Sequence, residues 1–80
     1  MIHLKYYFRE GCWLCDKAGE MLNGMTLKYG IDILAINIDS SEELYDLYRY
    51  DIPVLEFSDG STMNGNIKKK ELVLKLKSYK

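Results

Sequence analysis

The segment FREGCWLCDK, residues 8–17, contains both cysteines of the chain, Cys12 and Cys15. The residues that lead into it, Ile2–Phe8, are rich in β-branched and aromatic side chains, which predicts a β-strand. From Trp13 onward, apolar residues recur at helical spacing, which predicts an α-helix. The two cysteines are therefore expected where a strand has ended and the first turn of a helix begins.

The middle of the chain predicts a second strand and a second helix. The first helix is expected to end at Gly30, with Gly24 loosening its last turn. Ile31–Asp39 is a nearly continuous apolar run, which predicts a strand covered on both faces. Ser40 with Glu43 three residues later forms a capping-box pattern that opens the second helix. This helix is expected to end near Tyr50, and its inward side chains are expected to be Leu44, Leu47 and Tyr48.

The C-terminal part of the chain predicts a hairpin and a last helix. Pro53 bars helix, and two short strands, Val54–Phe57 and Ser61–Asn64, flank an Asp-Gly turn signal. A final helix is expected over Lys68–Tyr79. The order β-α-β-α-β-β-α predicts an α/β fold, with a mixed four-stranded sheet and helices on both faces. All of it fits one domain over residues 1–80.

Composition narrows the classes of function. Hydrophobic residues make up 48% and charged residues 29%, as in an ordinary globular domain, and the formal net charge of −1 gives no reason to expect nucleic acid or an anionic membrane as partner. No apolar run approaches the roughly 20 residues that span a bilayer, and no secretory signal is evident. Two cysteines are too few for a disulfide-stapled secreted scaffold, so we expect a reducing cytoplasm as the location. We also expect a monomer. The lysines interpreted as the solvated face of the last helix are Lys68, Lys69, Lys70, Lys75, Lys77 and Lys80.

The predicted position of the cysteine pair suggests redox chemistry. The unpaired N–H groups at a helix N-terminus carry roughly half a positive charge, so a thiolate at Cys12 would be stabilised there and its pKa should fall below the free value of about 8.5. Cys15 lies one turn further in and is expected to be more buried. This asymmetry predicts that Cys12 attacks a substrate disulfide and that Cys15 then releases the reduced product.

Two other interpretations of the pair remain open. A structural zinc site needs four ligands, and the chain offers two cysteines and His3, which lies at the far end of the first strand. No metal site within one chain is therefore expected, although a metal or cluster shared between two chains is an alternative. The pair could also be two inert core residues.

Three segments resemble a known family. REGCWLCDKA (residues 9–18), NIDSSEEL (37–44) and YDIPVLEF (50–57) resemble the short, bacterial-type glutaredoxin-like proteins of the thioredoxin fold. The resemblance covers essentially the whole chain. It implies a thiol–disulfide oxidoreductase that needs no bound cofactor, with glutathione as a possible co-substrate. The substrate would be a disulfide-containing protein or a glutathione-type molecule, and the reductant is unidentified. The competing hypothesis is a binding module of the same fold with little redox turnover.

The resemblance also assigns roles to individual residues. Cys12 matches the family's nucleophile and Cys15 its resolving cysteine. Pro53 matches the family's cis-proline, and the backbone of Ile52 before it would pair with an extended substrate chain. Arg9 occupies the place of a basic residue that meets a glutathione carboxylate in glutaredoxins. The alternative for Arg9 is a surface charge paired with a neighbouring acid, Glu10 or Asp16.

The sequence departs from the glutaredoxin pattern at several places. Trp13 and Leu14 stand between the cysteines instead of Pro-Tyr, and the Trp13 ring is expected either to contact substrate or to pack against neighbouring loops. Gly65 and Asn66 are expected to offer hydrogen bonds to substrate, but the acid that usually follows for glutathione is absent until Glu71. The buried acid that thioredoxins place under their cysteines also has no counterpart in the first strand.

Overall fold

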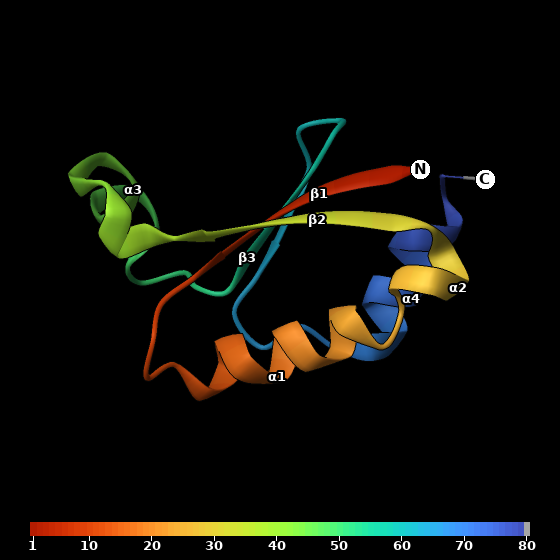
Figure 1. Ribbon diagram of the computed structural model, residues 1–80, viewed down its shortest axis with the longest axis horizontal. Coiled ribbons are helices and arrows are strands. Elements are labelled where there is room, and N and C mark those ends of the chain that lie inside the picture. The colour runs from red at the N-terminus through yellow and green to blue at the C-terminus, as the bar shows by residue number, and fades with distance from the viewer. Residues whose placement is uncertain (80) are drawn as a thin grey trace.

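The computed structural model describes residues 1–79 and has the predicted order of elements (Figure 1). The elements are β1 (Ile2–Phe8), α1 (Trp13–Asn23), α2 (Thr26–Tyr29), β2 (Ile31–Asn37), the 3-10 helix η1 (Ile38–Ser40), α3 (Glu42–Tyr48), β3 (Val54–Phe57), β4 (Thr62–Asn64) and α4 (Lys69–Lys77).

The four strands form one mixed sheet in the order β2-β1-β3-β4. β1 and β2 are parallel, in a register that runs from Ile2 opposite Ile31 to Phe8 opposite Asn37. β3 pairs antiparallel with both β1 and β4, so the closing hairpin and the mixed sheet are confirmed. β1 is therefore a central strand, held by backbone hydrogen bonds on both sides, and the chain that leaves its end leads directly to the cysteines.

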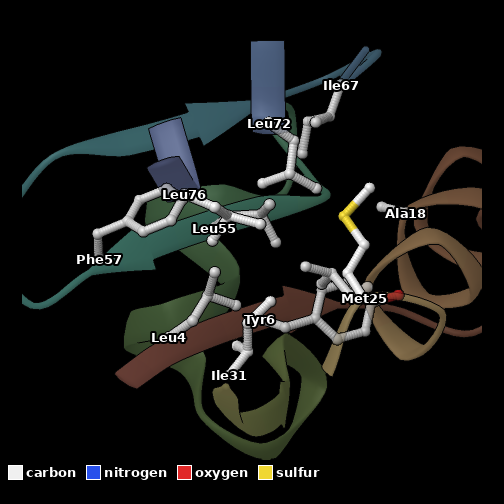
Figure 2. Packing of buried hydrophobic residues seen from close by; sticks show 11 residues of the cluster. Leu4, Tyr6, Ala18, Met25, Ile31, Leu55, Phe57, Ile67, Leu72 and Leu76 are labelled. Carbon is white, nitrogen blue, oxygen red and sulfur yellow. The ribbon is translucent and has the colours of Figure 1, made fainter. Parts of the chain in front are cut away.

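Helices cover both faces of the sheet. The larger core lies between the sheet and the layer formed by α1, α2 and α4 (Figure 2). Its buried residues are Leu4, Tyr6, Ala18, Leu22, Met25, Ile31, Leu55, Phe57, Ile67, Leu72 and Leu76. On the opposite face, the short helix α3 lies at one end of the sheet, far from α2 (Figure 1). There Tyr7, Ile38 and Val54 form a small second core against side chains of α3.

The first helix is interrupted, whereas the sequence predicted one helix up to Gly30. α1 ends at Asn23, and α2 starts at Thr26 after a turn at Gly24 and Met25. A glycine inside a helix is about 1 kcal/mol less favourable than alanine, and here the break lets the Met25 side chain enter the core. The predicted stop is confirmed, because Gly30 is left-handed with φ 63° and its N–H donates to the carbonyl of Thr26.

β2 is not covered on both faces, so that prediction was wrong. It is an edge strand of the sheet, and Leu34 is 58% exposed at its centre. The reason lies in α3, which has only seven residues and leaves the middle of this face bare. A continuous apolar run therefore did not distinguish a sheltered strand from an edge strand in this chain.

The start of the second helix also differs from the prediction. Its N-cap is Ser41, whose Oγ accepts the N–H of Leu44, so the capping box of Ser40 with Glu43 is wrong by one position. Ser40 belongs to η1 and donates its hydroxyl to the carbonyl of Asn37. The helix ends at Tyr48, with Arg49 as its C-cap, close to the predicted end near Tyr50. Leu44 and Tyr48 pack inward as expected, whereas Leu47 is 63% exposed.

A polar contact joins the tip of the hairpin to α4. Asp59 accepts the N–H of Ser61 at 2.9 Å and a hydrogen bond from Lys75 Nζ at 3.0 Å. Hydrogen bonds from Ser61, together with Lys75, hold the pKa of Asp59 well below its usual range. Lys75 is thus engaged with the hairpin instead of standing on a solvated face, and Leu72 and Leu76 of the same helix are buried. Lys80 lies outside the described residues.

Candidate active site

Cys12 is the N-cap residue of α1. Its backbone is extended, and its Sγ accepts the N–H of Cys15 at 3.1 Å. The turn before it depends on Gly11, which has φ 80°. A side chain is unfavourable at that backbone angle, so glycine is the residue that allows the strand to turn into the helix here. The sulfur of Cys12 therefore lies at the amide-rich tip of α1, where the sequence pattern predicted it.

The two cysteines differ sharply in accessibility. Cys15 is completely buried, at 0% exposure, whereas Cys12 is partly exposed. The two are joined in a disulfide with their Cα atoms 5.2 Å apart. The arrangement gives one sulfur that a partner can approach and a second sulfur directly behind it, which is the geometry that exchange through a mixed disulfide requires.

Tyr6 is a neighbour of the pair that the sequence reasoning missed. Its hydroxyl donates to the carbonyl of Cys15 in the buried interior. Burial, together with the charge of Asp16, raises the pKa of the Tyr6 hydroxyl, so the group is a neutral donor at ordinary pH. The available signal was the inward alternation of Leu4 and Tyr6 along β1, which points the phenol toward the helix that follows.

Trp13 and Leu14, between the cysteines, lie at the surface. The Trp13 side chain is 70% exposed, so the alternative in which its ring packs against neighbouring loops is wrong. Leu14 is partly buried. An exposed indole next to the accessible sulfur is a surface that an apolar part of a partner can contact.

The segment around Pro53 is already engaged in backbone hydrogen bonds. The Ile52–Pro53 peptide bond is cis, and Pro53 is buried. The N–H of Ile52 donates to the carbonyl of Tyr48 at 3.1 Å, and the N–H of Gly65 donates to the carbonyls of Pro53 and Asp51 at 3.1 and 3.2 Å. Two amides expected to meet substrate therefore have internal partners, whereas no backbone N–H within residues 1–79 donates to the carbonyl of Ile52.

Arg9 and Asn66 also have partners within the chain. The Nε of Arg9 donates to Asp39 at 3.1 Å, and its guanidinium lies 5.3 Å from the centre of the Tyr45 ring. The bond to Asp39 raises the pKa of Arg9. The pairing with Glu10 or Asp16 that the sequence suggested is wrong, because the partner comes from η1 on the α3 side. The amide oxygen of Asn66 accepts a hydrogen bond from Lys17 at 3.2 Å, which ties the loop after β4 to α1.

His3, the one histidine of the sequence, and the acidic side chains form no metal site with the cysteine pair within residues 1–79. His3 is exposed and lies 3.2 Å from Asp32, a partner on β2. In the described part of the chain no three such side chains converge into a group that could hold a metal ion. Over the same residues, 1–79, no helix combines the length and the hydropathy needed to cross a bilayer.

Taken together, a mixed sheet in this strand order and a CxxC pair at the start of α1 define a dithiol protein of the thioredoxin fold. Residues 3–77 match the family model of the glutaredoxin-like domain (DUF836), so the chain belongs to that family. Membership of this fold, with the cysteine pair, supports thiol–disulfide oxidoreductase chemistry at a general level.

Solved structures of other proteins share the fold of this chain. Protein XcR50 from X. campestris is 27% identical, with a TM-score of 0.81 over 94% of this chain and 96% of its own. Protein Ne2328 from Nitrosomonas europaea is 29% identical, with a TM-score of 0.72 over 90% and 86% of the two chains. The oxidised thioredoxin from Plasmodium falciparum, at 15% identity, shares the fold, with a TM-score of 0.74 over 98% of this chain and 80% of its own. No curated protein sequence matches the chain.

Proposed function

We propose that this protein is a glutaredoxin-like thiol–disulfide oxidoreductase that uses Cys12 as nucleophile and Cys15 as resolving cysteine. The observation that carries the proposal is the bond between the Cys15 N–H and Cys12 Sγ at the N-terminus of α1. An amide that donates to the sulfur, together with the positive end of the helix, favours the thiolate, which is the reactive form. The burial of Cys15 behind it supports the division of roles.

The reaction proceeds in two exchanges. In the reduced protein, the Cys12 thiolate attacks one sulfur of a substrate disulfide, forms a mixed disulfide and releases the other sulfur as a thiolate. Cys15 then attacks the sulfur of Cys12, the bond between Cys12 and the substrate breaks, and the second substrate thiolate leaves. The thiol proton of Cys15 ends on a released thiolate or in the solvent. The substrate gains two electrons, and the protein is left with its internal disulfide.

Substrate contacts are proposed around the accessible sulfur. The carbonyl of Ile52, beside Pro53, is free to accept one backbone N–H from an extended substrate chain. The exposed Trp13 ring and Leu14 would contact apolar atoms of the substrate next to its disulfide. These features are suited to a disulfide in an extended protein segment.

Groups that would meet glutathione already have partners within the chain. The Gly65 N–H would have to exchange an internal hydrogen bond, and the Nε of Arg9 and the amide oxygen of Asn66 are bound to Asp39 and Lys17. We therefore propose disulfide-containing proteins as the substrate class, with glutathione as a secondary co-substrate. No bound cofactor is needed, and a reducing cytoplasm is the proposed location.

The proposal is tested by trapping the intermediate. Cys15→Ser removes the resolving thiol but keeps the backbone amide that donates to Cys12. This variant should accumulate stable mixed disulfides with a peptide disulfide, and mass spectrometry should locate them at Cys12. Cys12→Ser is the matched control and should form none. Trapping by Cys12→Ser instead of Cys15→Ser would reverse the roles, and trapping by neither would contradict the proposed function.

A further inference from the structure

Tyr6 makes the one side-chain hydrogen bond from the sheet to the backbone of the cysteine turn within residues 1–79. Its hydroxyl donates to the carbonyl of Cys15, and both groups are buried. Figure 2 shows the ring extending from β1 toward α1, with its hydroxyl oxygen against that helix. The ring is held from the side by Phe8, stacked at 5.3 Å between centroids. The phenol thus connects a central strand of the sheet to the residue that carries the buried sulfur.

The hydroxyl of Tyr6 lies against Gly19, where a side chain would crowd it. A Cβ added to Gly19 would lie 3.1 Å from the hydroxyl oxygen of Tyr6 and 3.5 Å from the ring carbon that carries it. The first distance is tighter than ordinary contact, whereas the second is ordinary. Alanine is the better helix former, so a glycine in the interior of α1 is unfavourable for the helix itself. Its absent side chain leaves room for the hydroxyl.

The hydrogen bond matters most when the disulfide is open. In the oxidised protein a covalent bond fixes the first turn of α1. In the mixed disulfide that bond is absent, and the first turn of a helix is where its backbone is least held. The rate of an intramolecular attack depends on how closely the attacking atom is kept to its reactive position. A hydrogen bond from Tyr6 to the carbonyl of Cys15 limits the movement of this residue and therefore of its attacking sulfur.

From this geometry we infer that Tyr6 is a positioning residue for the resolving step: its hydroxyl holds the Cys15 turn in place while Cys15 attacks the sulfur of Cys12. The inference rests on the proposed function. It assigns Tyr6 no contact with the reacting sulfurs and no role in the first attack, which depends on the amides around Cys12. Tyr6 should therefore affect the second exchange and leave the first almost unchanged.

The aromatic disulfide dithiobis(nitrobenzoic acid) separates the two exchanges in a stopped-flow experiment. Attack by Cys12 of the reduced protein releases one thionitrobenzoate anion in a phase that depends on reagent concentration. Attack by Cys15 on Cys12 then releases the second anion in a phase that does not. Together the steps reduce the reagent by two electrons and leave the protein with its internal disulfide, and the thiol proton of Cys15 passes to the buffer.

Tyr6→Phe removes the hydroxyl and keeps the ring. We expect the second phase to slow about three- to tenfold, the range that corresponds to one hydrogen bond, and the first phase to stay within about twofold. Tyr7→Phe is the matched control: Tyr7 is also a buried tyrosine of β1, but its hydroxyl donates to Glu56 at 3.0 Å on the other face of the sheet. It should leave both phases unchanged. Equal second phases in the two variants would overturn the inference.

Gly19→Ala provides a second test in a variant whose helix propensity is raised. The added methyl crowds the hydroxyl of Tyr6 at 3.1 Å, so the hydroxyl must shift by a few tenths of an ångström and the second phase should slow even though alanine favours the helix. In a Tyr6→Phe background there is no hydroxyl to displace, and Gly19→Ala should cause no further slowing. Equal slowing in both backgrounds would contradict a role for the hydroxyl. If reduced wild-type protein releases no thionitrobenzoate in the second phase, the proposed function itself fails, which is a different result from a normal second phase in Tyr6→Phe.

Discussion

Gly11 controls the turn that delivers Cys12 to the tip of α1, and replacing it tests the local structure of the site. Its φ of 80° lies in the region that a side chain makes unfavourable, at about 1–2 kcal/mol for an L-residue. A Cβ at this position would meet no atom within 4 Å, so Gly11→Ala adds backbone strain without a clash. Alanine also restricts the unfolded chain, which returns about 0.4–1 kcal/mol. The expected net loss in the free energy of unfolding is therefore about 1 kcal/mol.

Gly24→Ala is the matched control for this change. Gly24 has φ −70°, which any residue adopts, and the nearest atom to a Cβ added there is a backbone oxygen at 3.6 Å. The substitution should stabilise the protein by about 0.4–1 kcal/mol, so the two glycine variants should move in opposite directions. Urea unfolding of the oxidised proteins, followed by far-ultraviolet circular dichroism, measures both. A Gly11→Ala protein as stable as Gly24→Ala would refute the strained turn before Cys12.

Three further outcomes follow from contacts elsewhere in the fold. The pKa of Asp59 is lowered because Ser61 and Lys75 bind its carboxylate. Its contribution to stability is therefore present above the unfolded pKa of about 3.9 and is lost as the pH falls below that value. The difference in the free energy of unfolding between wild type and Asp59→Asn should shrink over that pH range. Burial and Glu56 raise the pKa of the Tyr7 hydroxyl to about 12. An alkaline absorbance titration of Tyr7→Phe should therefore lack one tyrosine ionisation that the wild type shows near that pH. The contribution of Tyr7 to stability should decline as the pH rises above about 10. Leu34→Lys on the exposed edge strand β2 should change the free energy of unfolding by no more than about 0.5 kcal/mol. Leu22→Ala in the core should lower it by about 2–5 kcal/mol. Equal losses in urea unfolding would mean that Leu34 is covered.

The sequence predicted the site most successfully where local rules decide the structure. A strand that breaks at a glycine and continues as a helix places Cys12 at the N-cap, because helix periodicity and turn chemistry are both written into neighbouring residues. The hairpin of β3 and β4 was also predicted correctly, because the Asp-Gly turn signal lies between its two strands. The family resemblance then pointed to the position of Pro53, and the fold it implied agrees with the sheet order.

The sequence predictions were wrong where the burial or the partner of a residue depends on distant parts of the chain. The burial of Leu34 is decided by the length of α3, and the partner of Arg9 comes from a 3-10 helix that follows β2. The N–H groups of Ile52 and Gly65 are engaged by carbonyls whose positions only the folded chain defines. The hydrogen bond from Tyr6 to Cys15 likewise crosses between two elements, and no pattern of spacing specifies it.

The reactivity of Cys12 is tested most directly by the rate of its alkylation by iodoacetamide as a function of pH. The measurement is made on the Cys15→Ser variant, which has a single thiol and keeps the amide donor at position 15. We predict a midpoint well below the free-cysteine value of about 8.5, with normal behaviour after unfolding in urea. A midpoint at or above that value in the folded protein would contradict the claim that the tip of α1 holds this sulfur as a thiolate.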